Sequence, residues 1–300
     1  MKNKQRSLKL ALHVAFFGMG AFLLSCKSAS DPINAEITQT ANNELTQDAQ
    51  QDEVDDMATG QLNAGDGAGR LTASDSRVAC AYVIFEDTIG GKGQGTLTIN
   101  FNESANGSAN AAGCTDARGN VRKGTITITW SGGRWWKVGS TITIHLMDYS
   151  INGVVINGTR TLTNVSTVLL IPTWTISSNV TSTWPDSTKA TRTVNKTRAW
   201  NIAEGTVTTT QTSGFSFAAS GTNRHGKTYT VQITNPIVYS EACIAMDKVY
   251  FPVSGTKVII IDTNKEITMD FGNGTCDQTC TITYSGKSTT LTAKNDDSND

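Results

Sequence analysis

The feature that most constrains the fold is an alternation of threonine with large apolar residues in short segments. It is clearest in the ranges 125–130 and 141–146, where Ile, Leu or Trp occupies every second position. Successive side chains of a β-strand point to opposite faces, so each segment has one apolar face and one hydroxyl-bearing face. A sheet with one face in water is typically antiparallel. We therefore predict an all-β domain with antiparallel strands over residues 76–292.

The remaining strand candidates have the same β-branched and aromatic composition. They are 96–101, 154–156, 159–163, 168–176, 205–212, 228–233, 257–261 and 281–284. Asn152-Gly153 and Asn157-Gly158 have the residues of tight hairpin turns, and Pro172 makes the 168–176 segment an edge or broken strand. Hairpins and meanders are expected, because neighbouring strands usually pair. The pattern leaves open whether the strands form a two-sheet sandwich or one long bent sheet.

The chain begins with the pattern of a lipoprotein signal peptide at residues 1–25. Four basic residues precede or flank an apolar segment, 10–24, that is too short to cross a bilayer. The following Leu-Leu-Ser-Cys, ending at Cys26, resembles a bacterial lipobox, in which this cysteine becomes the lipidated first residue of the mature protein. We predict a membrane partner through Cys26 and an outer-membrane lipid anchor. The sequence leaves open whether the protein faces the periplasm or the cell surface.

The segment 26–75 has a different texture from the strands. Its residues 27–75 contain no aromatic side chain and are rich in Ala, Asn, Gln, Asp and Thr. A chain of this kind buries too little apolar surface to offset the entropy of ordering, which predicts a disordered tether. The acidic run 52–56 is then a solvated part of this tether. The polar end, 293–300, is expected to be a disordered tail.

The charge balance argues against a nucleic-acid partner. Residues 1–25 carry four of the 25 basic residues and no acid, so the rest has 21 basic and 26 acidic residues and a net charge of −5. Nucleic-acid binding depends on neutralising phosphates with basic side chains, and no basic run is present.

Five cysteines besides Cys26 can form disulfides in an exported protein. Cys80 and Cys114 are 34 positions apart, and Cys243 and Cys276 are 33 apart. Similar residues follow the second cysteine of each pair, so 243–286 looks related to the first pair's segment. We predict these two disulfides and an unpaired Cys280. Joining Cys276 to Cys280 is the alternative, but their spacing is not that of a Cys-x-x-Cys redox motif.

These turns and strands also carry a resemblance. The segments 113–132, 251–256 and 270–277, together with the lipobox, resemble Bacteroidota outer-membrane lipoproteins that have a Thr-rich all-β domain. The resemblance implies a cell-envelope location and an all-β fold. It implies no enzymatic activity.

The strongest ligand-binding candidate lies between two predicted strands. It consists of Arg134, Trp135, Trp136 and Lys137. Adjacent strand residues face opposite ways, so one tryptophan should be exposed, where it can stack on a sugar ring or touch lipid head groups. The alternative is a purely structural role for both rings.

The sequence has no Gly-x-Ser-x-Gly or His-Glu-x-x-His motif. We therefore expect no catalytic residues, no metal ligands and no cofactor, and a binding or structural role toward a glycan or an envelope protein. The alternative is a carbohydrate-active enzyme that uses two carboxylates. Its candidate acids are Glu86, Asp148, Glu204, Glu241 and Asp270.

Overall fold

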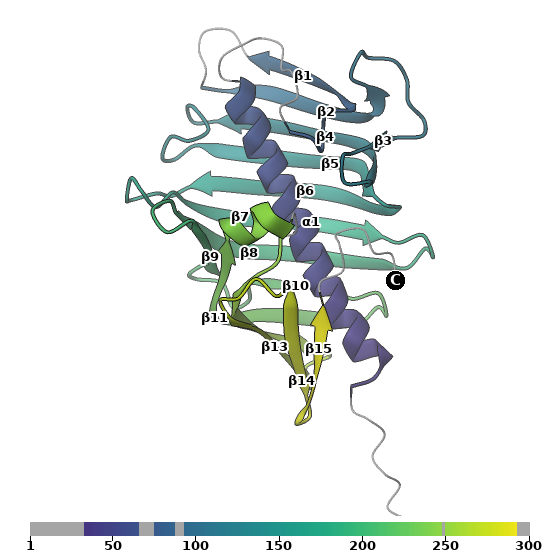
Figure 1. The fold of residues 1–300 in the computed structure, drawn as a ribbon, viewed down its shortest axis with the longest axis vertical. Coiled ribbons are helices and arrows are strands. Elements are labelled where there is room, and N and C mark those ends of the chain that lie inside the picture. Colours follow the sequence, from purple (N-terminus) through teal and green to yellow (C-terminus); the bar gives the residue numbers. More distant parts are fainter. Residues whose placement is uncertain (1–32, 66–74, 88–92, 248–249, 293–300) are drawn as a thin grey trace, which may run out of the picture. The chain divides into compact units, whose positions relative to one another are not determined.

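A computed structural model describes residues 33–65, 75–87, 93–247 and 250–292. In these residues, one 15-stranded antiparallel sheet carries two helices (Figure 1). The predicted all-β class is confirmed. The question that the sequence left open is answered as well, because the strands form one long sheet.

The elements follow one another in this order. They are α1 (Ala35–Gly65), β1 (Ala81–Asp87), β2 (Gly95–Ser104), β3 (Cys114–Thr115), β4 (Val121–Ser131), β5 (Thr141–Ile151), β6 (Val154–Asn164), β7 (Thr173–Thr183), β8 (Lys189–Asn201), β9 (Thr206–Gln211), β10 (Ala219–Thr222), β11 (Thr228–Ser240), α2 (Glu241–Asp247), β12 (Ser254–Ile261), β13 (Lys265–Asn273), β14 (Thr279–Tyr284) and β15 (Lys287–Thr292). Most strands pair with the next one along the chain. Between β8 and β11, the short strands β9 and β10 together occupy the place of one strand, each pairing with both neighbours.

The threonine alternation behaves as predicted. In β4, Ile126, Ile128 and Trp130 are buried, while the threonines between them are partly exposed. Asn152 and Gly153 form the β5–β6 turn, both with positive φ.

Two local predictions are wrong. Asn157-Gly158 lies inside β6 and not at a turn, and Gly158 is needed there because a Cβ would lie 2.2 Å from the backbone oxygen of Asn179 in β7. The strand predicted from residue 168 begins only at Thr173, because residues 168–171 form a turn.

The largest correction concerns the predicted tether. Residues 35–65 form the helix α1, which runs across the strands on one face of the sheet (Figure 1). The segment has no proline and many good helix formers, and the Asn34 side chain caps the helix by accepting a hydrogen bond of 3.1 Å from the amide of Ile37. The rest of the tether, at 26–32 and 66–74, lies outside the described residues, as do Cys26, the signal peptide and the 293–300 tail.

The helix is part of both apolar clusters of the core. Near its C-terminal end, Val54, Met57 and Leu62 pack in a cluster with residues of β2 and β4–β8. Near its N-terminal end, Ile37 and Ala41 pack with residues of β8–β14. The helix therefore covers the buried face of the sheet and is not an appendage.

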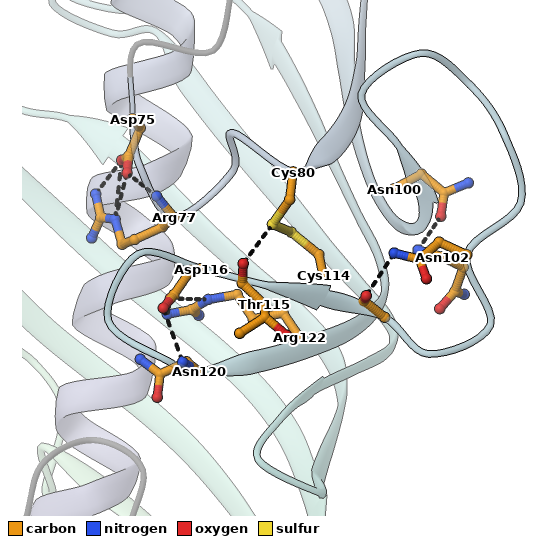
Figure 2. Close-up of a disulfide and its surroundings, with 12 residues drawn as sticks. Asp75, Arg77, Cys80, Asn100, Asn102, Cys114, Thr115, Asp116, Asn120 and Arg122 are labelled. Carbon is orange, nitrogen blue, oxygen red and sulfur yellow. Dashed lines mark hydrogen bonds and ion pairs between the residues drawn. A yellow bond between two sulfur atoms is a disulfide. The ribbon is translucent and has the colours of Figure 1, made fainter.

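Both predicted disulfides are present. Cys80 is joined to Cys114 (Figure 2) and Cys243 to Cys276, each with Cα atoms 5.5 Å apart. Each bond closes a segment that contains a hairpin, β1–β2 or β12–β13, whose second strand pairs with a third strand beyond the bond. Cys280 is unpaired, as predicted, and burial raises the pKa of its thiol to about 12.

Candidate functional site

The helix α1 meets the sheet through carboxylates as well as apolar side chains. Glu44, Asp48, Asp52 and Asp55 recur every three or four residues, which places them along one side of the helix. All four residues are at most 5 % exposed. Because a buried charge is stable only when it is paired, the sheet must supply cations opposite them.

The centre of this interface is a cluster of two acids and three cations, which we call the central ionic cluster. The Arg192 guanidinium donates to Glu44 at 2.9 Å and to Asp48 at 2.6 Å. Lys257 contacts both acids, whereas Lys196 contacts Asp48. With all five groups charged, the cluster has one positive charge in excess.

This excess explains the protonation behaviour of the cluster. Burial alone would raise the pKa of Asp48, but the nearby positive charges of Lys196, Lys257 and Arg192 hold it well below its usual value. The pKa of Lys196 is lowered to about 8, mainly by burial. Repulsion by Lys257 and Arg192 acts in the same direction, whereas attraction by Asp48 opposes it. As the pH rises, the central ionic cluster therefore loses its excess positive charge when Lys196 gives up its proton.

The other helix acids are paired in the same way. Asp55 accepts two hydrogen bonds from Arg160, at 2.8 and 2.6 Å, and Asp52 lies 2.6 Å from the Arg198 guanidinium. Every carboxylate of α1 has at least one ion-pair partner outside the helix. The acids are Glu36, Glu44, Asp48, Asp52, Glu53, Asp55 and Asp56.

Glu53 belongs to a network near the first disulfide. Arg122 donates to Glu53 at 2.8 Å and to Asp116 at 3.0 Å, and it also bonds the hydroxyl of Tyr149. Figure 2 shows Arg122 and Asp116 beside the Cys80–Cys114 bond. This end of the helix is thereby tied to β4, which begins shortly after the disulfide-closed segment.

A cavity of about 390 Å³ lies between the C-terminal half of α1 and the sheet. Its volume falls in the range of small-molecule sites, and its walls are mostly apolar. It is lined by Asp52, Asp55, Asp56, Thr59, Asn63, Trp135, Leu162, Pro172, Trp174, Arg198, Trp200, Ile202, Val207, Tyr239, Ile244 and Tyr250.

Aromatic rings make up much of the cavity wall. Trp135 and Trp174 are stacked, with ring centroids 6.2 Å apart. Arg198 lies over the rings of Trp200 and Tyr239, at 6.0 and 5.6 Å from their centroids. The buried indole N–H of Trp135 has no hydrogen-bond partner among the described residues, so the protein leaves one polar atom of this wall unsatisfied.

Polar groups lie on the helix side of the cavity. Asp52 and Asp55 are bound by Arg198 and Arg160, and the half-exposed Asp56 lies 2.6 Å from Arg77. The Tyr250 hydroxyl donates to Asp56, and burial, followed by the charge of Asp56, raises the pKa of this tyrosine. The tyrosine therefore stays a neutral hydrogen-bond donor.

The two rings of the predicted tryptophan site meet edge to face, with centroids 5.6 Å apart, but only one of them reaches the cavity. Trp135 is partly buried and lines the cavity, whereas Trp136 is 43 % exposed and lies outside it. Arg134 lies over the Trp136 ring, 5.0 Å from its centroid, and Lys137 is exposed. Of these four residues, only Trp135 belongs to the cavity.

The acids considered for glycoside hydrolysis lie elsewhere. Glu86, Asp148, Glu204, Glu241 and Asp270 are all exposed, and none of them lines the described cavity. The cavity acids are those of the predicted tether, which sequence reasoning missed. A signal was present in β8, where Arg192, Lys196 and Arg198 alternate in the same phase as the apolar residues of the strand.

Within the described residues, no group of three or more His, Cys, Asp or Glu side chains is placed to hold a metal ion. The helices described for this chain include none that is long and apolar enough to cross a membrane. Comparisons with protein-family models, curated proteins and solved structures give no match. The resemblance to Bacteroidota lipoproteins therefore stays a prediction.

Proposed function

We propose that this protein is a non-catalytic binding module of the cell envelope, anchored through lipidated Cys26, and that it binds a glycan in the cavity beside α1. One observation carries the proposal: the cavity combines stacked aromatic walls with a row of fixed polar groups. Proteins that bind small ligands use such apolar walls together with a few placed polar atoms.

The chemistry of a sugar ring suits both sides of this cavity. One face of a pyranose carries mainly C–H groups, which stack on the faces of large aromatic rings such as Trp135 and Trp200. Its hydroxyls can donate to carboxylate oxygens such as those of Asp56 and to the Tyr250 hydroxyl oxygen, whose own proton is donated to Asp56. A glycan therefore uses more of the lining than a purely apolar ligand would.

The carboxylates of the cavity support binding over hydrolysis. A glycosidase needs two carboxyl groups free to act as acid and as base or nucleophile. Asp52, Asp55 and Asp56 are each bonded to an arginine, and the first two hold α1 on the sheet. A carbohydrate-active enzyme is the alternative, and hydrolysis of a bound glycan by the wild type would favour it.

The binding proposal is tested by a glycan array followed by calorimetric titration of the glycan retained. Trp135→Ala should weaken binding by about fivefold, because a ring contact contributes roughly 1 kcal/mol. Trp136→Ala is the matched control and should bind as the wild type does, since its ring lies outside the cavity. Failure of the wild type to retain any glycan, or unchanged binding by Trp135→Ala, would contradict the proposal.

The anchor is tested separately in cells. A clickable palmitate analogue should label the wild type, and Cys26→Ala should abolish the label and release the protein from the membrane fraction. Cys280→Ala should keep both, because that thiol is buried within β14. Equal labelling of the wild type and Cys26→Ala would contradict lipidation at this cysteine.

A further inference from the structure

Exposed apolar side chains gather at the ends of three hairpins. The connections are 132–140 between β4 and β5, 165–172 between β6 and β7, and 202–205 between β8 and β9. We call these exposed side chains the apolar tip. They are Trp136, Val138, Val165, Val168, Leu169, Leu170 and Ile202.

The β6–β7 connection is an unusual turn. Ile171 donates a backbone hydrogen bond to Val168 at 3.2 Å, which places two leucines at the corner of the turn. Leu169 is 92 % exposed, and Leu170 is 57 % exposed. Turn corners normally carry Gly, Pro, Asn, Asp or Ser, so this turn breaks the rule in order to present apolar side chains outward.

The three connections form one surface. The side-chain amide of Asn164 donates to the backbone oxygen of Trp136 at 2.9 Å, joining the β4–β5 and β6–β7 connections. The amide of Ile202 donates to the oxygen of Leu170 at 3.3 Å, joining the β8–β9 connection to them. Antiparallel pairing brings all three to the same end of their strands.

The polar residues around the tip indicate its partner. Arg134 lies over the Trp136 ring, and Lys137 is exposed beside it, whereas Glu204 is the only acid in the three connections. Tryptophan with neighbouring cations is typical of protein segments at a lipid head-group layer, and cations favour anionic lipids. A turn corner is also convex, which suits insertion between lipids better than a flat protein contact.

We propose that the apolar tip inserts into the surface of a lipid bilayer that contains anionic lipids. Leu169 and Leu170 enter the boundary between head groups and acyl chains, Trp136 lies at the level of the head groups, and Arg134 and Lys137 face lipid phosphates. Ile202 belongs both to the tip and to the cavity lining. This end of the cavity therefore lies near the membrane surface.

The test uses the full lipidated protein in vesicles of phosphatidylethanolamine and phosphatidylglycerol with nitroxide-labelled acyl chains. An environment-sensitive fluorophore is attached to Leu169→Cys or, as the control, to His225→Cys. His225 is exposed in the β10–β11 turn, at the opposite end of the strands. Cys280 is fully buried and should not react.

We expect the nitroxide to reduce the fluorescence at position 169 by at least about twofold, since inserted groups lie at the acyl boundary, and to leave that at position 225 nearly unchanged. Replacing phosphatidylglycerol by phosphatidylcholine, or adding Leu170→Ser, should reduce the quenching at position 169. Equal quenching at the two positions, or none at position 169, would overturn the proposal. Energy transfer between labels at position 169 without lipid quenching would assign the tip to a second copy of the chain and would also overturn it.

Discussion

The two kinds of contact that hold α1 on the sheet differ in what they specify. The ends of the helix bury apolar side chains such as Ile37 and Met57, whereas its middle buries Glu44 and Asp48 against cations. An apolar contact tolerates a shift or a swap of similar volume. A buried ion pair does not, because any shift leaves a charge without a partner. The apolar ends thus stabilise the contact between α1 and the sheet, and the ionic middle fixes where the helix lies along the sheet.

The largest effect should come from breaking the ionic middle. Asp48→Asn leaves Arg192 and Lys257 with Glu44 alone and removes the acid that Lys196 contacts. We expect a loss of about 3–5 kcal/mol in the free energy of unfolding. Urea denaturation measures this loss. Glu36→Gln is the control, because its pair with Lys265 is partly exposed and should contribute less than about 1 kcal/mol. Equal losses in the two variants would contradict the expectation that the buried ion pairs in the middle of α1 contribute more than the partly exposed pair near its N-terminal end.

An apolar end should respond to volume instead. Met57 is fully buried, so Met57→Ala should cost about 3 kcal/mol through lost burial and a cavity. Met57→Leu keeps the volume and should cost less than about 1.5 kcal/mol. The same denaturation experiment measures both. A loss with Met57→Leu as large as that with Met57→Ala would show that this end, too, depends on a specific shape.

A smaller effect distinguishes the cations of the middle. Lys196→Met removes the excess positive charge of the central ionic cluster and should change the free energy of unfolding by less than about 1 kcal/mol, because an apolar replacement of a buried ion is often neutral. Lys257→Met should cost more, since Lys257 contacts both acids whereas Lys196 contacts only Asp48. A larger loss with Lys196→Met than with Lys257→Met would contradict our assignment of the excess positive charge to Lys196.

The last effect concerns the pH dependence of stability. The pKa of Lys196 is about 8 in the folded protein and 10.5 ordinarily, so between these values the unfolded state binds more protons. The free energy of unfolding should therefore rise with pH from about 8 to 9.5, by at most about 1.4 kcal/mol per unit. The measurement is the difference between the wild type and Lys196→Met. A difference that falls or stays constant with pH would contradict the lowered pKa.

The sequence predicts best the features whose signals are local. Strand alternation identifies the buried Ile126 and Ile128 directly, because it depends only on neighbouring residues. The pairing of Cys80 with Cys114 follows from a comparison of two similar segments. Trp135 is the one predicted ligand-binding residue that lines the cavity.

The rest depends on contacts between distant residues. Composition predicts disorder for 26–75 because it counts apolar side chains, whereas α1 is ordered partly by cations such as Lys257, 213 positions after Glu44. Residues of α1 and of several strands line the cavity, so no single segment of the sequence contains the residues that would reveal it. The turn at 168–171 also escapes prediction, because Val, Leu and Ile are strand formers.

The position of α1 in the chain has a consequence for how the protein is made. The helix leaves the ribosome before any of its cations, and its bond to Lys265 joins residues 229 positions apart. The partners of its carboxylates are then made in stages, from Arg77 ahead of β1 to Lys265 in β13. The last of the seven carboxylates is paired only when nearly the whole chain exists, and contacts between such distant residues make folding slow.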